Sequence, residues 1–507
     1  MTRADTNLAP PPALYPPLFP PQYLGTGLIS VMGPSFAFLP IARELVKGGM
    51  DDGLSAEVAY GKFLGTCLVA ALLEIGIALF PPRIIGKIFP PIVCGTAVTL
   101  IGAALTGAGL KYWGGGVFCA ENDISREAAF GGGPQSCLGN NGEVDLPYGS
   151  PEFVGFGFLT VFMLVLVETF GAPFWKNCSV VVALLIVYFI AMGVSYTAPD
   201  GTKQAFVTFA FTKAAVENAP ITFFWMKTFP LGFSAEGILP LIVAFFVSSA
   251  ETVGDIGATC DASEIDATGP DADSRVQGGL LSDGVNSFLA ALFTTSPNTT
   301  YSQNSGVIAI TRCASRAAGV ACACWLMLFG LIGPLGGFCS DIPNCVLGGM
   351  VTFLFANVMV SGIQILSTVG ITRRNRIILS FALGIGLGVA MQPNFIQGGG
   401  SATFFGDTLN MNIGFWPKKY GCKTDTITLS STTRFGQTWV SGCEWDPGMV
   451  GLRNACVIFL KTPYCIGTVI ALILNLVLPM DEIELAAKKA REEAKTSKKT
   501  APATSTA

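Results

Sequence analysis

The residues of this sequence best placed for binding chemistry are acidic side chains that interrupt long apolar stretches. Glu251 and Asp255 lie four residues apart, so on a helix they share one face, and Asp283 follows in the next apolar stretch. A carboxylate that faces lipid costs ~2.5 kcal/mol or more, so we expect this face to meet protein or a water-filled cavity. Hydrogen bonding between helices and solvation at a helix end remain alternatives, above all for Asp255 or Asp283 taken singly. Glu74, a lone acid near the end of a stretch, is interpreted in that structural way.

A polar segment at residues 301–312 is the second candidate, because it contains glycine and is too short to cross a bilayer as one apolar helix. Backbone that departs from a helix at membrane depth is tolerated only where protein covers it or where it lines a cavity. Gln303 offers an amide donor beside an amide acceptor, which can pair with adjacent N–H and C=O groups of an oxidised purine or pyrimidine. Glu251, as a carboxylate acceptor, suits a second ring N–H. The sequence has no histidine, so any proton coupling is expected to use carboxylates.

The elements that hold these residues are predicted to be membrane-spanning helices. Of the 507 residues, 51% are hydrophobic and 13% are charged, and apolar stretches long enough to span ~30 Å of hydrocarbon recur along the chain. This pattern predicts an all-α polytopic membrane protein with about twelve spans. The first span and the segment at 303–315 are expected to be broken. The expected segments lie at residues 22–42, 60–80, 88–110, 153–172, 178–196, 236–257, 278–296, 303–315, 317–338, 343–367, 375–396 and 457–479.

Positive charges in the short loops orient these spans. With the N-terminus inside, the cytoplasmic connections receive Arg83, Arg275, Arg312 and the cluster at 373–376, as the positive-inside rule favours. Both tails, at residues 1–21 and 480–507, are then cytosolic. The long outside loops contain two candidate disulfides, Cys119 with Cys137 and Cys422 with Cys443.

Several functional classes lack support in the sequence. It contains no nucleophile paired with a base, no phosphate-binding glycine loop and no cluster of metal ligands, so we predict no enzyme, ATP-driven pump, metal site or cofactor. The net charge of −4 is spread over loops and tail, and no basic, aromatic-rich patch indicates a nucleic-acid partner.

Motifs around the acids resemble those of one transporter family. Gln303-Asn304-Ser305-Gly306, followed by Thr311-Arg312, resembles the signature motif of the nucleobase-ascorbate transporters, also called nucleobase-cation symporter family 2. Residues 251–256 and 282–285 are similar to that family's eighth and ninth transmembrane segments. Residues 23–30, with Ser35-Phe36-Ala37, resemble the third segment of its fungal uric acid-xanthine permeases. By this resemblance, Gln303 at the first motif position implies xanthine and uric acid as substrates.

The resemblance also implies roles for individual residues. Gln303 and Glu251 are expected to hydrogen-bond the substrate, Phe36 to stack on the base, and Ser302 to offer main-chain contacts. Stacking suits any flat base, so discrimination is expected from the hydrogen bonds. Ordinary core packing remains the alternative for Phe36. The residues expected to shape the site and its proton linkage are Asp255, Asp283, Asn304, Thr311 and Gly306.

The fold that the resemblance implies has fourteen spans in two inverted seven-span repeats, with a core domain, a gate domain and two broken segments that contain short strands. The third-segment motif begins at residue 23, so the family's first two spans have no counterpart in this chain. A shortened gene model is the favoured explanation and a truncated isoform the alternative. The expected parts are a cytosolic tail at 1–21, an incomplete first core part at 22–80, a first gate part at 88–196, a second core part with the substrate site at 236–338, a second gate part at 343–479 and a cytosolic tail at 480–507.

The function implied by this reading is a proton-coupled symporter that imports xanthine and uric acid across the plasma membrane. The protein is expected to be a multi-pass homodimer in the lipid bilayer. Two alternatives stay open: a truncated, non-transporting isoform or regulatory protein of the same family, and an anion carrier on a similar fold. The acids around the site and the lack of a basic residue there weigh against the anion carrier.

Overall fold

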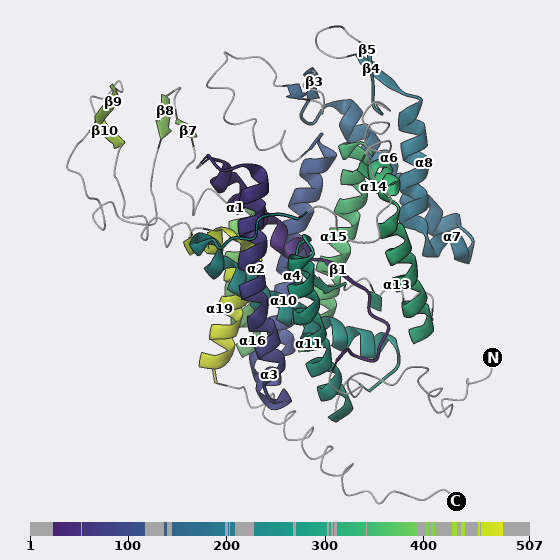
Figure 1. Ribbon diagram of the computed structural model, residues 1–507, viewed down its shortest axis with the longest axis vertical. Coiled ribbons are helices and arrows are strands. Elements are labelled where there is room, and N and C mark those ends of the chain that lie inside the picture. Colours follow the sequence, from purple (N-terminus) through teal and green to yellow (C-terminus); the bar gives the residue numbers. More distant parts are fainter. Residues whose placement is uncertain are drawn as a thin grey trace, which may run out of the picture.

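The protein is built around a bundle of helices, seen in side view in Figure 1. The computed structural model describes part of the chain. That part comprises residues 24–51, 53–116, 136–138, 144–197, 201, 203–207, 228–266, 270–301, 304–305, 308, 312–340, 342–392, 401–404, 407–410, 428–432, 438–441, 455–456 and 458–479.

Within this part, six helices are long and apolar enough to cross a membrane. They are α2 (Ala56–Ala78), α4 (Pro91–Trp113), α6 (Pro151–Phe170), α10 (Ala235–Ala262), α15 (Asn344–Ser367) and α16 (Arg373–Met391). Three shorter helices are also apolar, namely α8 (Ser179–Met192), α13 (Arg316–Leu331) and α19 (Pro463–Val477). The remaining helices are α1 (Leu39–Asp51), α3 (Pro82–Ile88), α7 (Pro173–Asn177), α11 (Pro270–Leu292) and α14 (Gly333–Ser340).

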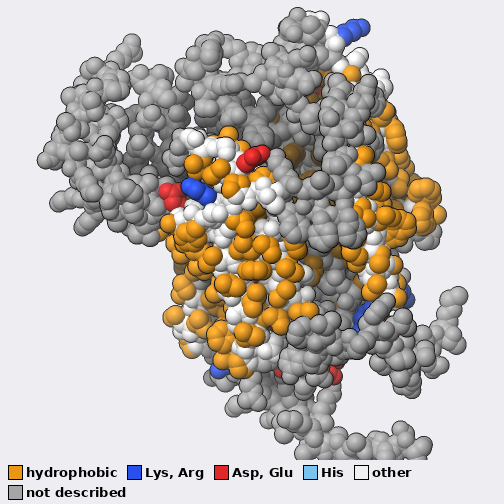
Figure 2. All heavy atoms as spheres, in the orientation of Figure 1, with side chains coloured by type: hydrophobic (Ala, Val, Ile, Leu, Met, Phe, Trp, Pro, Cys, Tyr) orange, Lys and Arg blue, Asp and Glu red, His pale blue; other side chains and the backbone are white. Residues whose placement is uncertain are grey.

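The described surface of the bundle is largely hydrophobic in the view of Figure 2, where Lys, Arg, Asp and Glu side chains appear at few places. Large exposed side chains on α6 and α7 include Phe158, Phe162, Phe170, Phe174 and Trp175. A surface of this kind is unusual for a protein in water but matches the hydrocarbon of a bilayer. Together with the six apolar helices, it makes the chain a multi-pass membrane protein.

Most helices follow the predicted spans closely, but α1 runs on to Asp51, beyond the first predicted span at 22–42, and one helix has an unexpected break. The first span is broken as predicted, because strand β1 (Met32–Pro34) and the 3₁₀ helix η1 (Phe36–Phe38) precede α1. The predicted span at 317–338 is interrupted at one residue, since α13 ends at Leu331 and α14 begins at Gly333. Pro334 has no N–H to continue the helical hydrogen bonds, and Ile332 leaves the helical region at φ −94° and ψ 81°.

Short antiparallel ribbons in the long loops are absent from the all-α prediction. Strands β9 (Thr428–Thr432) and β10 (Thr438–Ser441) contain β-branched or aromatic residues, which favour strands, although segments this short give little periodicity in the sequence. The four candidate disulfide cysteines lie outside the side chains that the structure describes. The ribbons pair β2 (Ser136–Leu138) with β3 (Val144–Pro147), β4 (Ser195–Thr197) with β5 (Lys203–Ala205), β7 (Ser401–Phe404) with β8 (Asp407–Asn410), and β9 (Thr428–Thr432) with β10 (Thr438–Ser441).

Close helix packing at small residues holds the bundle together. Helices α4 and α15 lie along one another. A Cβ on Gly102 would lie 2.3 Å from the backbone N of Met359, and one on Gly362 would lie 2.4 Å from the backbone N of Thr99. Glycine lets membrane helices approach this closely. On the other side of the bundle α2 packs against α10 and α11, the helices that carry the predicted acids.

Candidate functional site

Two segments far apart in the sequence meet inside the bundle, at the strand β1 labelled in Figure 1. Strand β1 pairs with β6 (Asn298–Thr300) in antiparallel fashion. The backbone N–H of Ser35 extends the pairing by donating to the carbonyl oxygen of Pro297 at 2.8 Å. The side-chain amide of Asn304 donates to the carbonyl oxygen of Val31 at 2.9 Å. These bonds satisfy backbone groups of two broken segments, which a bilayer would otherwise leave without partners.

A cavity of about 870 Å³ lies beside this strand pair. Its volume falls within the range of small-molecule sites, which is ~300–1,000 Å³. Apolar side chains of α4 and α15 form much of its wall, among them Ile101, Leu105 and Phe355. Polar groups enter from the broken segments and from α10. The cavity can therefore take a compact molecule that has both apolar surface and polar groups.

Among the described residues that line the cavity, Glu251 is the one acidic side chain. It lies midway along α10 and is 6% exposed. Thr299 Oγ1 on β6 donates to Glu251 Oε2 at 3.4 Å and lies 3.4 Å from Ser248 Oγ. The strand therefore holds this carboxylate at the cavity wall, where it can accept a hydrogen bond from a ligand.

Asp255 and Asp283 lie near Glu251 but do not line the cavity. Thr300 Oγ1 donates to Asp255 Oδ2 at 2.9 Å, which ties β6 to α10 one turn beyond Glu251. Thr252 Oγ1 donates to Asp283 Oδ2 at 2.5 Å, which ties α10 to α11. Both aspartates are buried. The structure thus gathers the three predicted acids on one side of α10, and only Glu251 reaches the cavity.

Phe36 lines the cavity, and 46% of its surface is exposed. Its ring centroid lies 4.9 Å from that of Phe355 in an edge-to-face arrangement. The next aromatic residue, Phe38, is by contrast fully buried against Phe245. Phe36 is therefore free to present a ring face to a ligand.

Four predicted site residues, namely Gln303, Ser302, Gly306 and Thr311, lie outside the described residues. Their described neighbours Tyr301, Asn304 and Ile308 line the cavity.

Several residues of this site were not predicted from the sequence. Tyr301 lines the cavity, and its hydroxyl donates to the carbonyl oxygen of Pro34 at 3.3 Å. Thr299 and Thr300 donate hydrogen bonds to two different carboxyl groups, those of Glu251 and Asp255. The only sign of this in the sequence is the pair of adjacent threonines just before the polar segment. The structural interpretation of Glu74 agrees with its place near the end of α2, where it takes part in a hydrogen bond between helices. Its side chain is fully buried and accepts a hydrogen bond from Ser249 Oγ at 3.2 Å.

Comparison with known proteins places this architecture among permeases. The model of the Permease family (Xan_ur_permease) matches residues 18–133 and 128–395. A uric acid-xanthine permease of Emericella nidulans is 37% identical over 478 residues, covering 92% of this chain and 72% of the relative. A purine permease of the same organism is 38% identical over 387 residues, covering 74% and 63%.

More distant similarities extend to bacteria. The xanthine permease XanP of Escherichia coli is 30% identical over 379 residues, covering 74% of this chain and 73% of the relative. A solved structure, the transmembrane domain of the cyanobacterial bicarbonate transporter BicA, is similar at a TM-score of 0.40 and 14% identity, covering 67% of this chain and 81% of that one. The family model and the 37% identical relative each span most of this chain, so the chain belongs to the Permease family, Xan_ur_permease.

Proposed function

We propose that this chain is a proton-coupled symporter that imports xanthine and uric acid across the plasma membrane. The single observation that carries the proposal is the cavity of about 870 Å³, whose described lining includes one acidic side chain, Glu251, and the exposed ring of Phe36. Relatives named as uric acid-xanthine, purine and xanthine permeases support the choice of substrate. An oxidised purine has apolar ring faces and carries ring N–H and C=O groups at its edge, which suits a mostly apolar cavity with a few polar groups in its wall.

Each site residue has a role in this proposal. Glu251 accepts a hydrogen bond from a ring N–H, and Gln303 offers its amide to the adjacent N–H and C=O groups. Phe36 stacks on the base, and Ser302 provides main-chain contacts. Asn304 pins the polar segment to the backbone of Val31. Asp255, Asp283, Gly306 and Thr311 shape the site and its proton linkage.

The remaining parts of the proposal concern how the site moves and assembles. The strand pair and the acids belong to a core domain, formed by residues 22–80 and 236–338, which carries the substrate past a gate domain formed by residues 88–196 and 343–479. Two copies associate as a homodimer, with the terminal segments 1–21 and 480–507 on the cytosolic side. Glu251 is the one charged side chain among the described lining residues. A negative charge in the cavity wall would repel an anionic substrate, which argues against the alternative of an anion carrier.

The proposal is tested by uptake of radiolabelled xanthine and uric acid into yeast cells that lack their own purine transport. The unmodified chain is compared at acidic and near-neutral pH with Glu251→Gln and with Glu168→Gln, a matched control on the exposed surface of α6. A hydrogen bond to a charged group is worth ~1.5–3 kcal/mol, so Glu251→Gln is expected to lower uptake by roughly 10-fold to 100-fold. Glu168→Gln is expected to transport as the unmodified chain does. Unmodified chain that reaches the cell surface and moves neither purine would overturn the proposal.

A further inference from the structure

A second pair of acids lies behind the cavity, between helices α2 and α11. Glu74 and Asp283 are both fully buried, and neither lines the cavity. The two helices come close together at this point because Gly284 has no side chain. A Cβ on Gly284 would lie 2.9 Å from the backbone N of Ile75 and 3.3 Å from the carbonyl carbon of Glu74. The backbones of α2 and α11 therefore lie close together at the two acidic residues.

Each of these carboxyl groups has one oxygen satisfied by a hydroxyl of α10. Ser249 Oγ donates to Glu74 Oε1 at 3.2 Å, and Thr252 Oγ1 donates to Asp283 Oδ2 at 2.5 Å. The other oxygens, Glu74 Oε2 and Asp283 Oδ1, are buried and receive no hydrogen bond from any donor in the described part of the chain. Leaving such oxygens without a donor is costly in an apolar interior.

The two carboxyl groups can form a hydrogen bond with each other only if one of them carries a proton. They lie within hydrogen-bonding contact of each other. A carboxylate has no hydrogen to donate, so this contact is a hydrogen bond only when one of the two carries an O–H. The charged groups that act on the pair from the neighbouring helix α10 are Glu251 and Asp255, which are also acidic. Among the described residues, no Lys or Arg side chain acts on the charge of either carboxyl group. A proton is therefore the positive charge that can join the two acids.

We propose that Glu74 and Asp283 form a two-carboxyl site for the transported proton, with Glu74 as an essential partner. This inference rests on the proposed symport and deepens it. When the site is loaded, an O–H bond on one carboxyl donates to the free oxygen of the other; on release the proton leaves and two carboxylates remain. The site is linked to the cavity through α10, because Thr252 and Ser249 hold the pair while Glu251, next to Thr252, reaches the cavity.

The test compares concentrative uptake of xanthine with exchange of xanthine at equal concentrations on both sides of the membrane. Purified protein in proteoliposomes is assayed as the unmodified chain, Glu74→Gln, Glu74→Asp and the surface control Glu168→Gln. We expect Glu74→Gln to lose proton-driven accumulation by about tenfold or more while exchange continues, because an amide cannot take up the proton. Glu74→Asp keeps the acid and is expected to keep coupling, as is Glu168→Gln. Xanthine-induced proton uptake, followed by a pH-sensitive dye, should disappear in Glu74→Gln alone.

The outcomes separate this inference from the proposed function. An unmodified chain that moves neither xanthine nor uric acid overturns the proposed function, and one that moves them without protons overturns symport and this site with it. If the unmodified chain is proton-coupled and Glu74→Gln keeps its accumulation and proton uptake, the two-carboxyl site alone is wrong. Infrared spectroscopy gives a readout that does not need transport. The C=O stretch of a protonated carboxylic acid should be present in the unmodified protein and absent from both Glu74→Gln and Asp283→Asn, and its persistence in either variant would refute the shared proton.

Discussion

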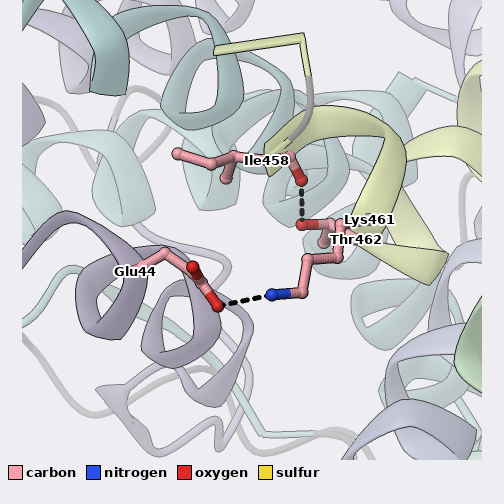
Figure 3. A network of polar contacts seen from close by, with 4 residues as sticks. All are labelled: Glu44, Ile458, Lys461 and Thr462. Atoms are coloured by element: carbon pink, nitrogen blue, oxygen red, sulfur yellow. Dashed lines mark hydrogen bonds and ion pairs between the residues drawn. The ribbon is translucent and has the colours of Figure 1, made fainter. Parts of the chain in front are cut away.

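The ammonium group of Lys461 lies 2.7 Å from Glu44 Oε1 and joins α1 to the helical residues that precede α19 (Figure 3). The next residue, Thr462, donates its hydroxyl to the carbonyl oxygen of Ile458 at 2.7 Å, which holds this turn in place. The Lys461 and Glu44 side chains are 24% and 42% exposed, so solvent screens their attraction. In the proposed division of the chain, Glu44 belongs to the core domain and Lys461 to the gate domain.

Breaking this ion pair is expected to change stability only slightly. Glu44→Gln or Lys461→Met should each lower the free energy of unfolding by ~0.2–1 kcal/mol, because exposed pairs contribute little. The exchanged pair, Glu44→Lys with Lys461→Glu, should recover most of that loss. Thermal unfolding of the purified protein in detergent, analysed as a double-mutant cycle, measures the coupling between the two residues. Strict additivity of the two single changes would show that the contact contributes nothing.

The sequence was sufficient to predict the helical framework because the bilayer imposes a simple pattern. Apolar stretches of about twenty residues can only be helices at membrane depth, so their positions follow from composition. The break at Ile332 was missed because the stretch around it stays apolar and only the Gly333-Pro334 pair marks the boundary. The loop ribbons were missed because strands of three to five residues leave too little alternation to detect.

The site was predicted only in part, because contacts between distant segments do not appear in local spacing. The shared face of Glu251 and Asp255 follows from helical geometry, yet the spacing does not say which of them reaches the cavity. The pairing of β1 with β6 decides that, since its threonines hold the two acids at different depths. Glu74 and Asp283 interact although they are more than 200 positions apart in the sequence, and no pattern near Glu74 predicts this interaction.

Removing the ring of Phe36 is expected to weaken substrate binding without unfolding the protein. Stacking of a base on an aromatic ring is worth ~1–3 kcal/mol, so Phe36→Ala should raise the Kd for xanthine by roughly 5-fold to 150-fold. Phe36→Trp retains an aromatic face and should bind more tightly than the alanine variant. Leu39→Ala is the matched control, because Leu39 has the same 46% exposure but does not line the cavity. Binding of radiolabelled xanthine to purified protein measures the effect, and equal Kd values for Phe36→Ala and Leu39→Ala would exclude stacking.

The hydrogen bond from Thr300 to Asp255 is expected to stabilise the strand pair against α10. Thr300→Val keeps the shape of the side chain but removes the donor that lies 2.9 Å from Asp255 Oδ2. A buried group that loses a partner typically costs ~1–3 kcal/mol, so the midpoint of thermal unfolding should fall. Thr300→Ser keeps the hydroxyl and should unfold close to the unmodified protein. If the valine and serine variants unfold at the same temperature, the hydrogen bond does not contribute to the stability of the protein.

Gly284 is expected to be required for the contact between α11 and α2. In Gly284→Ala the new Cβ would lie 2.9 Å from a backbone nitrogen of α2, a distance that forces the helices apart. Overpacking of this kind typically costs ~1–3 kcal/mol, which should appear as a lower midpoint of thermal unfolding.

Gly257 in α10 provides the matched control for this change. A Cβ there would meet nothing within 4 Å, so Gly257→Ala should be neutral or stabilise by up to ~1 kcal/mol, since alanine costs less than glycine in a helix. Separation of α11 from α2 would also part Asp283 from Glu74, so Gly284→Ala should lose proton-driven accumulation of xanthine together with stability. A Gly284→Ala protein that matches Gly257→Ala in both measurements would show that the close approach of these helices is not needed for either.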